Sequence, residues 1–153
     1  MIIVSIAEQM LYHRRRTGVW YAYPVSTATA GIGHERNSLR TPAGKHRICA
    51  MIGEGMPAHT VFIGRQPAGV YIPGKSDPSR DWILGRILWL DGMELGKNKR
   101  GRVDTKRRYI YIHGTHDEAR LGTPVSHGCI RMSPADMLEV FEHARTGERV
   151  LIR

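Results

Sequence analysis

The stretch Arg107–Gly114, RRYIYIHG, alternates between two kinds of side chain with a period of two. This period is typical of a β-strand, with Ile110 and Ile112 on one face and Tyr109, Tyr111 and His113 on the other. Gly114 follows directly, so we expect His113 at the end of the strand. A histidine there lies at the margin of a sheet, where its side chain can reach into a cleft.

Similar strand-like runs, separated by turn residues, occupy most of the chain. The expected strands are IIVSI (2–6), QMLYH (9–13), VWYAYPVS (19–26), HRICAMI (46–52), HTVFIG (59–64), WILGRILWLDG (82–92) and ERVLIR (148–153). RRRTG (14–18) reads as the turn of a hairpin. Without an internal repeat or a linker, the sequence predicts a single, mainly β domain over residues 1–153.

One helix is expected near the C-terminal end. Ser133 is a suitable N-cap, Pro134 fits the first helical position, and Asp136 fits a Ser-x-x-Asp capping pattern. Apolar residues then recur at helical spacing, and Gly147 is expected to end the helix.

Composition limits the possible function classes. The 153 residues are 41% hydrophobic, with 17 glycines and 8 prolines, as in a turn-rich globular protein. No apolar run approaches the ~18 residues of a membrane span, so membrane insertion is not expected. The N-terminal stretch lacks the basic region of a signal peptide. If Met1 is the native start we expect a cytoplasmic protein, and otherwise a periplasmic or cell-wall one.

The formal net charge of +9 points to acidic partners. Much of it lies in RRRTG and in KNKRGRVDTKRR (97–108), which has seven basic residues in twelve. The second segment is either a solvated loop or an anion-binding surface. A basic nucleic-acid-binding module is therefore an alternative function, although no aromatic residue interrupts the segment to stack on bases.

The chain has two cysteines, and their surroundings in the sequence lead to different expectations for each. Cys49 lies among apolar residues of an expected strand and is predicted to be a small buried residue. Cys129, in PVSHGCIRM (124–132), is a packing residue, a metal ligand or a nucleophile. A loop of suitable length can bring His113 against it, and a nearby imidazole can take the proton of a thiol.

The metal alternative is a zinc site made by His113, His116, His127 and Cys129. The spacing of the first two in an expected loop argues against it, and we expect neither metal nor other cofactor. Gly128 allows a tight turn, which could direct backbone N–H groups around Cys129 at a developing oxyanion.

IHGT and PVSHGCIRM, in this order, resemble the signature of the L,D-transpeptidase (YkuD-domain) family. The matching residues are His113-Gly114-Thr115 and Ser126-His127-Gly128-Cys129-Ile130-Arg131. Upstream, YPVSTA and TPAGKHRI resemble the family's Pro-Val-Ser-Thr-Gly and Thr-Pro-x-Gly-x-Phe-x-Ile segments. The resemblance runs from about Tyr12 to the C-terminus.

The resemblance implies the β-sandwich or barrel-like L,D-transpeptidase fold with one or two short helices. It implies acyl transfer at the bond between the third residue and D-alanine of peptidoglycan stem peptides, through a Cys129 thioester. His113 would be the general base, oriented by the Gly114 carbonyl. His127 and Gly128 would support an oxyanion hole, with Ser126 and Arg131 shaping the loop or meeting substrate.

The absence of a visible leader favours an L,D-carboxypeptidase that acts on soluble muropeptides during recycling. A transpeptidase that forms 3-3 cross-links or exchanges D-amino acids is the alternative. HERNSLRTPAG (34–44) is longer than the family's usual connection and suggests an altered substrate loop.

Overall fold

The computed structural model describes residues 1–153. The strands are β1 (Ile2–Ser5), β2 (Met10–Arg14), β3 (Trp20–Pro24), β4 (Gly44–Ile52), β5 (Thr60–Ile63), β6 (Gln66–Val70), β7 (Leu84–Gly92), β8 (Tyr111–Gly114), β9 (Ile130–Met132) and β10 (Arg149–Ile152). The α-helix is α1 (Pro134–His143), and two 3-10 helices are η1 (Gly101–Val103) and η2 (Glu118–Arg120). The expected mainly β architecture with short helices is thus observed.

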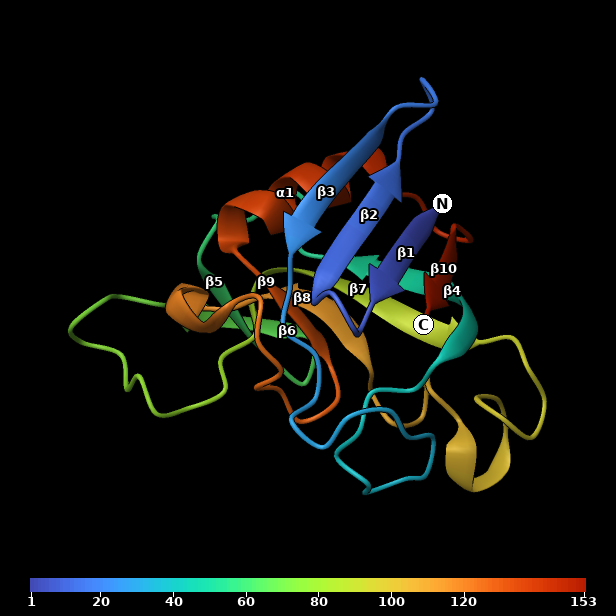
Figure 1. Ribbon diagram of the computed structural model, residues 1–153. Coiled ribbons are helices and arrows are strands. Elements are labelled where there is room, and N and C mark those ends of the chain that lie inside the picture. The colour runs from blue at the N-terminus through green and yellow to red at the C-terminus, as the bar shows by residue number, and fades with distance from the viewer.

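All ten strands belong to one curled sheet (Figure 1). Its main path runs β3-β2-β1-β10-β4-β7-β5-β6, and a branch leaves β7 through β8 to β9. The first and last strands pair in parallel, which ties both ends of the chain together. β8 and β9 also pair in parallel, although only fifteen positions separate Gly114 from Cys129 along the chain.

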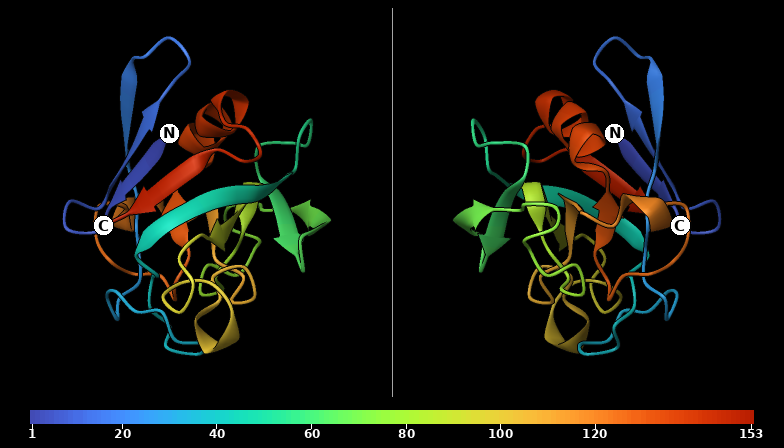
Figure 2. Two further views of the ribbon diagram at one scale, coloured as in Figure 1. Left: turned by 90° about the vertical axis from the view of Figure 1, so that its right-hand side faces the viewer. Right: turned by 90° about the vertical axis from the view of Figure 1, so that its left-hand side faces the viewer.

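The helix α1 lies on the inner side of the curled sheet, where the main core forms (Figure 2). It buries Met137, Val140 and Phe141 against apolar side chains of the strands. Ser133 caps it as expected, since its Oγ accepts a hydrogen bond of 3.0 Å from the N–H of Asp136. None of the helices is both long and apolar enough to span a bilayer.

The helix is shorter than expected and ends at His143 rather than near Gly147. The chain turns earlier because residues 145–148 dock on neighbouring groups. The N–H of Arg145 donates to the Glu148 carboxylate, and the N–H of Gly147 donates to the carbonyl of Ile48 in β4. These tertiary contacts end the helix before Gly147, the glycine at which the sequence pattern predicted its end.

The strand expected within Arg107–Gly114 is also shorter, because β8 begins only at Tyr111. Tyr109 has a φ of 55° and is exposed, so it lies outside the strand. Cys49 is half-buried rather than buried, because the register of β4 against β7 shifts between Ile48 and Ala50. Strands β6 and β9 were not expected from the sequence.

Candidate functional site

The two short strands β8 and β9 bring the predicted site residues together. His113 and Arg131 are partners in the parallel register, and Ile112 pairs with Ile130. The two isoleucines lie in the main core together with α1. Because side chains alternate along a strand, His113 and Arg131 lie on the opposite face of the sheet. Cys129, two positions before Arg131, packs on that face beside Tyr111.

The thiol of Cys129 is held by the backbone of the β8 segment. The N–H of Tyr111 donates to Sγ over 3.3 Å, and the S–H donates to the carbonyl of Tyr109 over 3.4 Å. Burial raises the pKa of the Cys129 thiol to about 11, with a further small increase from the Asp81 carboxylate, while the Tyr111 N–H opposes this change. Cys129 is therefore a neutral thiol at physiological pH.

The imidazole of His113 is almost fully buried, with 1% of its surface exposed. Its Nδ1 lies 2.7 Å from the Gly114 carbonyl oxygen, which is the contact that the family resemblance implies. A carbonyl only accepts hydrogen bonds, so Nδ1 carries the proton and Nε2 is left as the basic nitrogen. Burial lowers the pKa of His113, so the ring is neutral near pH 7 and able to accept a proton.

The loop before β9 is shaped by Ser126, whose Oγ donates to the Cys129 carbonyl over 2.6 Å. The same Oγ accepts the N–H of Gly128 over 3.2 Å, so this N–H is already used within the loop. The N–H groups of His127 and Cys129 donate to no acceptor within the chain. Of the three N–H groups expected around an oxyanion, those of His127 and Cys129 thus have no acceptor in the chain, whereas that of Gly128 is bound by Ser126.

Gly128 has a φ of 134°, a conformation that side chains disfavour. An added Cβ would also lie 3.2 Å from Ile110 and 3.3 Å from the carbonyl oxygen of Arg40. Thr41 fixes the same position from the opposite side, since its hydroxyl donates to the Gly128 carbonyl over 2.9 Å. Glycine is therefore required for the turn that precedes Cys129.

Asp81 is a site residue that the sequence argument missed. It lies in the long loop between β6 and β7, which projects to the left in Figure 1. Its carboxylate is 2.8 Å from the buried Arg131 guanidinium and 3.5 Å from His127 Nδ1. Burial raises the pKa of Asp81, but the charge of His113, in the protonated form that it takes at acid pH, and the charge of Arg131 outweigh this effect and lower that pKa. Arg131 thus faces a carboxylate of the chain itself.

A second loop, residues 33–40, is attached beside the site by Arg108. The guanidinium donates to the carbonyls of Gly33, His34 and Arg40, and to the Ser38 hydroxyl. This loop belongs to the segment that is longer than the family pattern. Between it and His127 lies a pocket of about 290 Å³, which is also lined by the three arginines Arg36, Arg107 and Arg108.

The residues of the zinc alternative are not arranged as ligands. His116 Nε2 is hydrogen-bonded to the Pro78 carbonyl at 2.9 Å, and His127 faces Asp81. No group of three His, Cys, Asp or Glu side chains in the chain is placed to hold a metal ion.

Many charges of the basic segment 97–108 have partners within the chain. Lys99 pairs with Asp91 at 3.0 Å, Lys97 with Glu94 at 3.6 Å and Arg102 with Glu35 at 3.5 Å. Lys106 lies over the ring of Trp89. These contacts favour the solvated-loop interpretation of the segment over a nucleic-acid-binding surface.

The chain belongs to the L,D-transpeptidase catalytic domain (YkuD) family, whose pattern it matches over residues 1–152. The search of curated proteins finds no significant match.

Solved structures of L,D-transpeptidases share the fold. The enzyme from Mycobacterium smegmatis superposes with a TM-score of 0.61 at 15% identity, over 99% of this chain and 57% of its own. L,D-transpeptidase 3 from Mycobacterium tuberculosis, solved with a faropenem-derived adduct, gives a TM-score of 0.58 at 18% identity, over 99% and 59%. A mutant of the Enterococcus faecium enzyme gives 0.59 at 15%, over 99% and 48%. The chain thus spans about half to three-fifths of these proteins.

Proposed function

We propose that this chain is a cysteine acyl-transfer enzyme that cleaves the L,D bond between the third residue and D-alanine of peptidoglycan tetrapeptides. The observation that carries the proposal is the pair formed by Cys129 and His113. The thiol is bound to the backbone of the β8 segment, and the imidazole, on the same face of β8, keeps Nε2 free. A neutral thiol and a neutral imidazole on one face of the sheet are the starting state for general-base attack.

In the proposed first step, Nε2 of His113 takes the thiol proton as Sγ of Cys129 attacks the carbonyl carbon of the third residue. The resulting oxyanion is stabilised by the free N–H groups of His127 and Cys129, and one such donor contributes about 3 kcal/mol in other enzymes. The imidazolium then protonates the D-alanine nitrogen, the C–N bond breaks, and a thioester remains.

We further propose that water resolves the thioester, which makes the enzyme an L,D-carboxypeptidase. His113 would take a proton from water, the hydroxide would add to the thioester carbonyl, and the protonated thiol of Cys129 would leave. This choice draws on the pocket of about 290 Å³ beside the site, which three arginines line. Its arginines suit a peptide rich in carboxylates.

The test is incubation with a disaccharide tetrapeptide, followed by mass spectrometry of the products. Hydrolysis yields the tripeptide and free D-alanine, whereas dimers or incorporation of added D-methionine would indicate transpeptidation. Cys129→Ala should abolish either reaction and His113→Asn should slow it by roughly 10² to 10⁴, while Cys49→Ser is the matched cysteine control and should remain active. Full activity of Cys129→Ala would refute the mechanism.

A further inference from the structure

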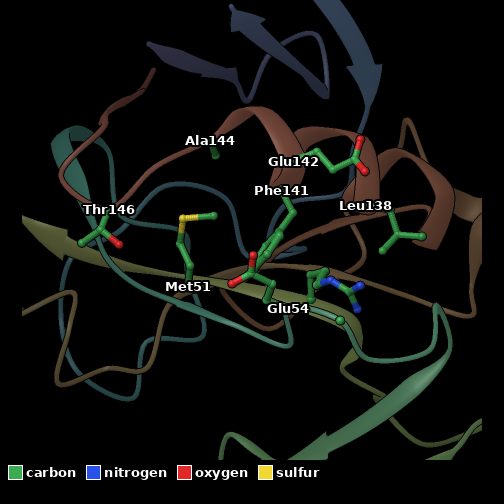
Figure 3. Close-up of a pocket in the computed structure, with 9 residues that line it drawn as sticks. Met51, Glu54, Leu138, Phe141, Glu142, Ala144 and Thr146 are labelled. Atoms are coloured by element: carbon green, nitrogen blue, oxygen red, sulfur yellow. The ribbon is translucent and has the colours of Figure 1, made fainter.

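A cavity of about 790 Å³ lies between the C-terminal half of α1 and the strands β4 and β7 (Figure 3). Its apolar wall is made by Met51, Leu138, Phe141 and Ala144. Two carboxylates, Glu54 and Glu142, lie at its exposed rim, and Arg86 of β7 lines its interior. In Figure 3, Phe141 extends from the helix and Glu54 from the strand side, both toward the middle of the pocket. The volume is within the range of small-molecule sites.

Arg86 is the unusual member of this cavity, because it is a buried cation with no ion pair. Only 8% of its surface is exposed, and its one hydrogen bond joins Nη1 to the carbonyl of the preceding residue, Gly85, over 2.7 Å. The guanidinium also lies 5.5 Å from the centre of the Phe141 ring. Buried charges are normally paired, since an unpaired one costs free energy. The remaining N–H groups of Arg86 donate to no acceptor of the chain and are open to solvent rather than sealed in the core, so a ligand in the cavity can reach them.

The backbone around Arg86 leaves space for the side chain to lie in the cavity. A Cβ at Gly53 would lie 3.3 Å from the Cδ of Arg86 and 2.9 Å from the carbonyl oxygen of Gly85. Gly53 has a φ of 104°, which also favours glycine. Gly53 therefore leaves room for the side chain of Arg86. A leucine or methionine at position 86 would fill the same wall of the cavity without an unpaired charge.

We propose that this cavity is a second binding site, which takes a short zwitterionic peptide with its carboxylate on Arg86. The planar guanidinium presents parallel N–H groups that match a carboxylate. The apolar wall accepts an aliphatic side chain. The carboxylates of Glu54 and Glu142 at the rim disfavour a multiply charged anion such as a nucleotide, and they attract the ammonium group of a zwitterion.

The site is independent of the thiol. Arg86 and Leu88 are two positions apart in β7, and Leu88 belongs to the core that packs on α1. Ile87 between them pairs with His113 and faces the opposite side of the sheet. Cys129 and this cavity are thus on opposite faces, so the inference does not depend on the proposed function.

The experiment is isothermal titration with the dipeptide leucyl-leucine and two derivatives, each of which removes one charge. The free dipeptide should bind saturably at millimolar concentrations. Its C-terminal amide should bind at least tenfold more weakly, and its N-acetyl form about threefold more weakly. Arg86→Met should weaken binding of the free dipeptide at least tenfold, whereas Arg102→Met, at an exposed arginine, should leave it unchanged.

Thermal unfolding distinguishes this role from a purely structural one. Replacing an unpaired buried charge by an apolar side chain should leave the Tm of Arg86→Met unchanged or higher. The dipeptide should raise the Tm of the wild type and of Cys129→Ala equally, and that of Arg86→Met much less. Absence of saturable binding to the wild type, or equal affinity of wild type and Arg86→Met, would overturn the proposal.

Discussion

The raised pKa of Cys129 predicts a specific pH dependence for its reaction with iodoacetamide. With a pKa of about 11, only about one thiol in 10⁴ is ionised at pH 7, against roughly 3% for a free thiol with a pKa of ~8.5. A more basic thiolate is also a better nucleophile, by roughly tenfold for this difference. Alkylation should therefore be some 20- to 30-fold slower than that of a free thiol at pH 7.

The shape of the profile is a stronger test than the rate, because it does not depend on access to the site. Mass spectrometry of the Cys129 peptide after timed alkylation should show a roughly tenfold rise per pH unit from pH 7 to 10, without a plateau. N-acetylcysteine should level off near its own pKa. A plateau of the Cys129 rate below pH 8 would refute the reasoning, since it would mean a preformed thiolate.

Two substitutions separate the contributions to this profile. Asp81→Asn should lower the pKa of Cys129 and speed alkylation, because the carboxylate disfavours the thiolate. His113→Asn should leave the alkylation profile unchanged, since the imidazole is neutral in this range, yet slow acylation by tetrapeptide by roughly 10² to 10⁴. Circular dichroism at each pH controls for unfolding.

Three further predictions concern stability. Burial raises the pKa of Glu148, but hydrogen bonds from His13 and the chain's amino group dominate and lower it to about 2 from the ordinary 4.5. The charge of Glu148 stabilises the fold above pH 4.5 by on the order of 3 kcal/mol, and this contribution is lost as the pH falls toward 2. Urea unfolding of Glu148→Gln should therefore show a lower free energy of unfolding at pH 7. It should also show a weaker dependence of that free energy on pH in the acid range. Burial lowers the pKa of His46 to about 4, so on acidification this histidine is protonated in the unfolded chain before it is protonated in the folded one. The free energy of unfolding should therefore fall by up to about 3 kcal/mol between pH 6.5 and pH 4. The same dependence of this free energy on pH in wild type and in His46→Gln would contradict the prediction. In a double-mutant cycle, Arg131→Met and Asp81→Asn should couple by about 1 kcal/mol, reduced by the partial exposure of the aspartate, and additive effects would show that the ion pair contributes nothing.

Local patterns predicted most of the strands because each strand carries its own alternation or turn signal. They failed where tertiary contacts decide the backbone. Tyr109 leaves the expected strand in a turn whose N–H groups are bound by Asp104 and by the Lys106 carbonyl. The short strand β9 has only three residues and exists through its pairing with β8. No pattern within three residues could reveal that partner.

The residues of the candidate site that lie in the two short segments IHGT and PVSHGCIRM could be predicted from the sequence. Chemistry and spacing made Cys129 and His113 candidates, and the family resemblance implied their roles. The fold places both on one face of the sheet. Asp81 was missed because its loop carries no motif and is 50 positions before Arg131 in the chain. The use of the Gly128 N–H by Ser126 was likewise invisible, since it depends on the direction of one hydroxyl.

The resting protonation states have a consequence for selectivity under the proposed mechanism. A thiol with a pKa of about 11 is poorly reactive toward electrophiles that wait for a thiolate. The same thiol reacts with an acyl donor only when the carbonyl is positioned so that His113 removes the proton during attack. Burial therefore lowers the reactivity of Cys129 toward electrophiles in general without preventing the reaction that His113 assists. The selectivity of the site would then come from the flanking loops, which position the substrate, rather than from the intrinsic nucleophilicity of the cysteine.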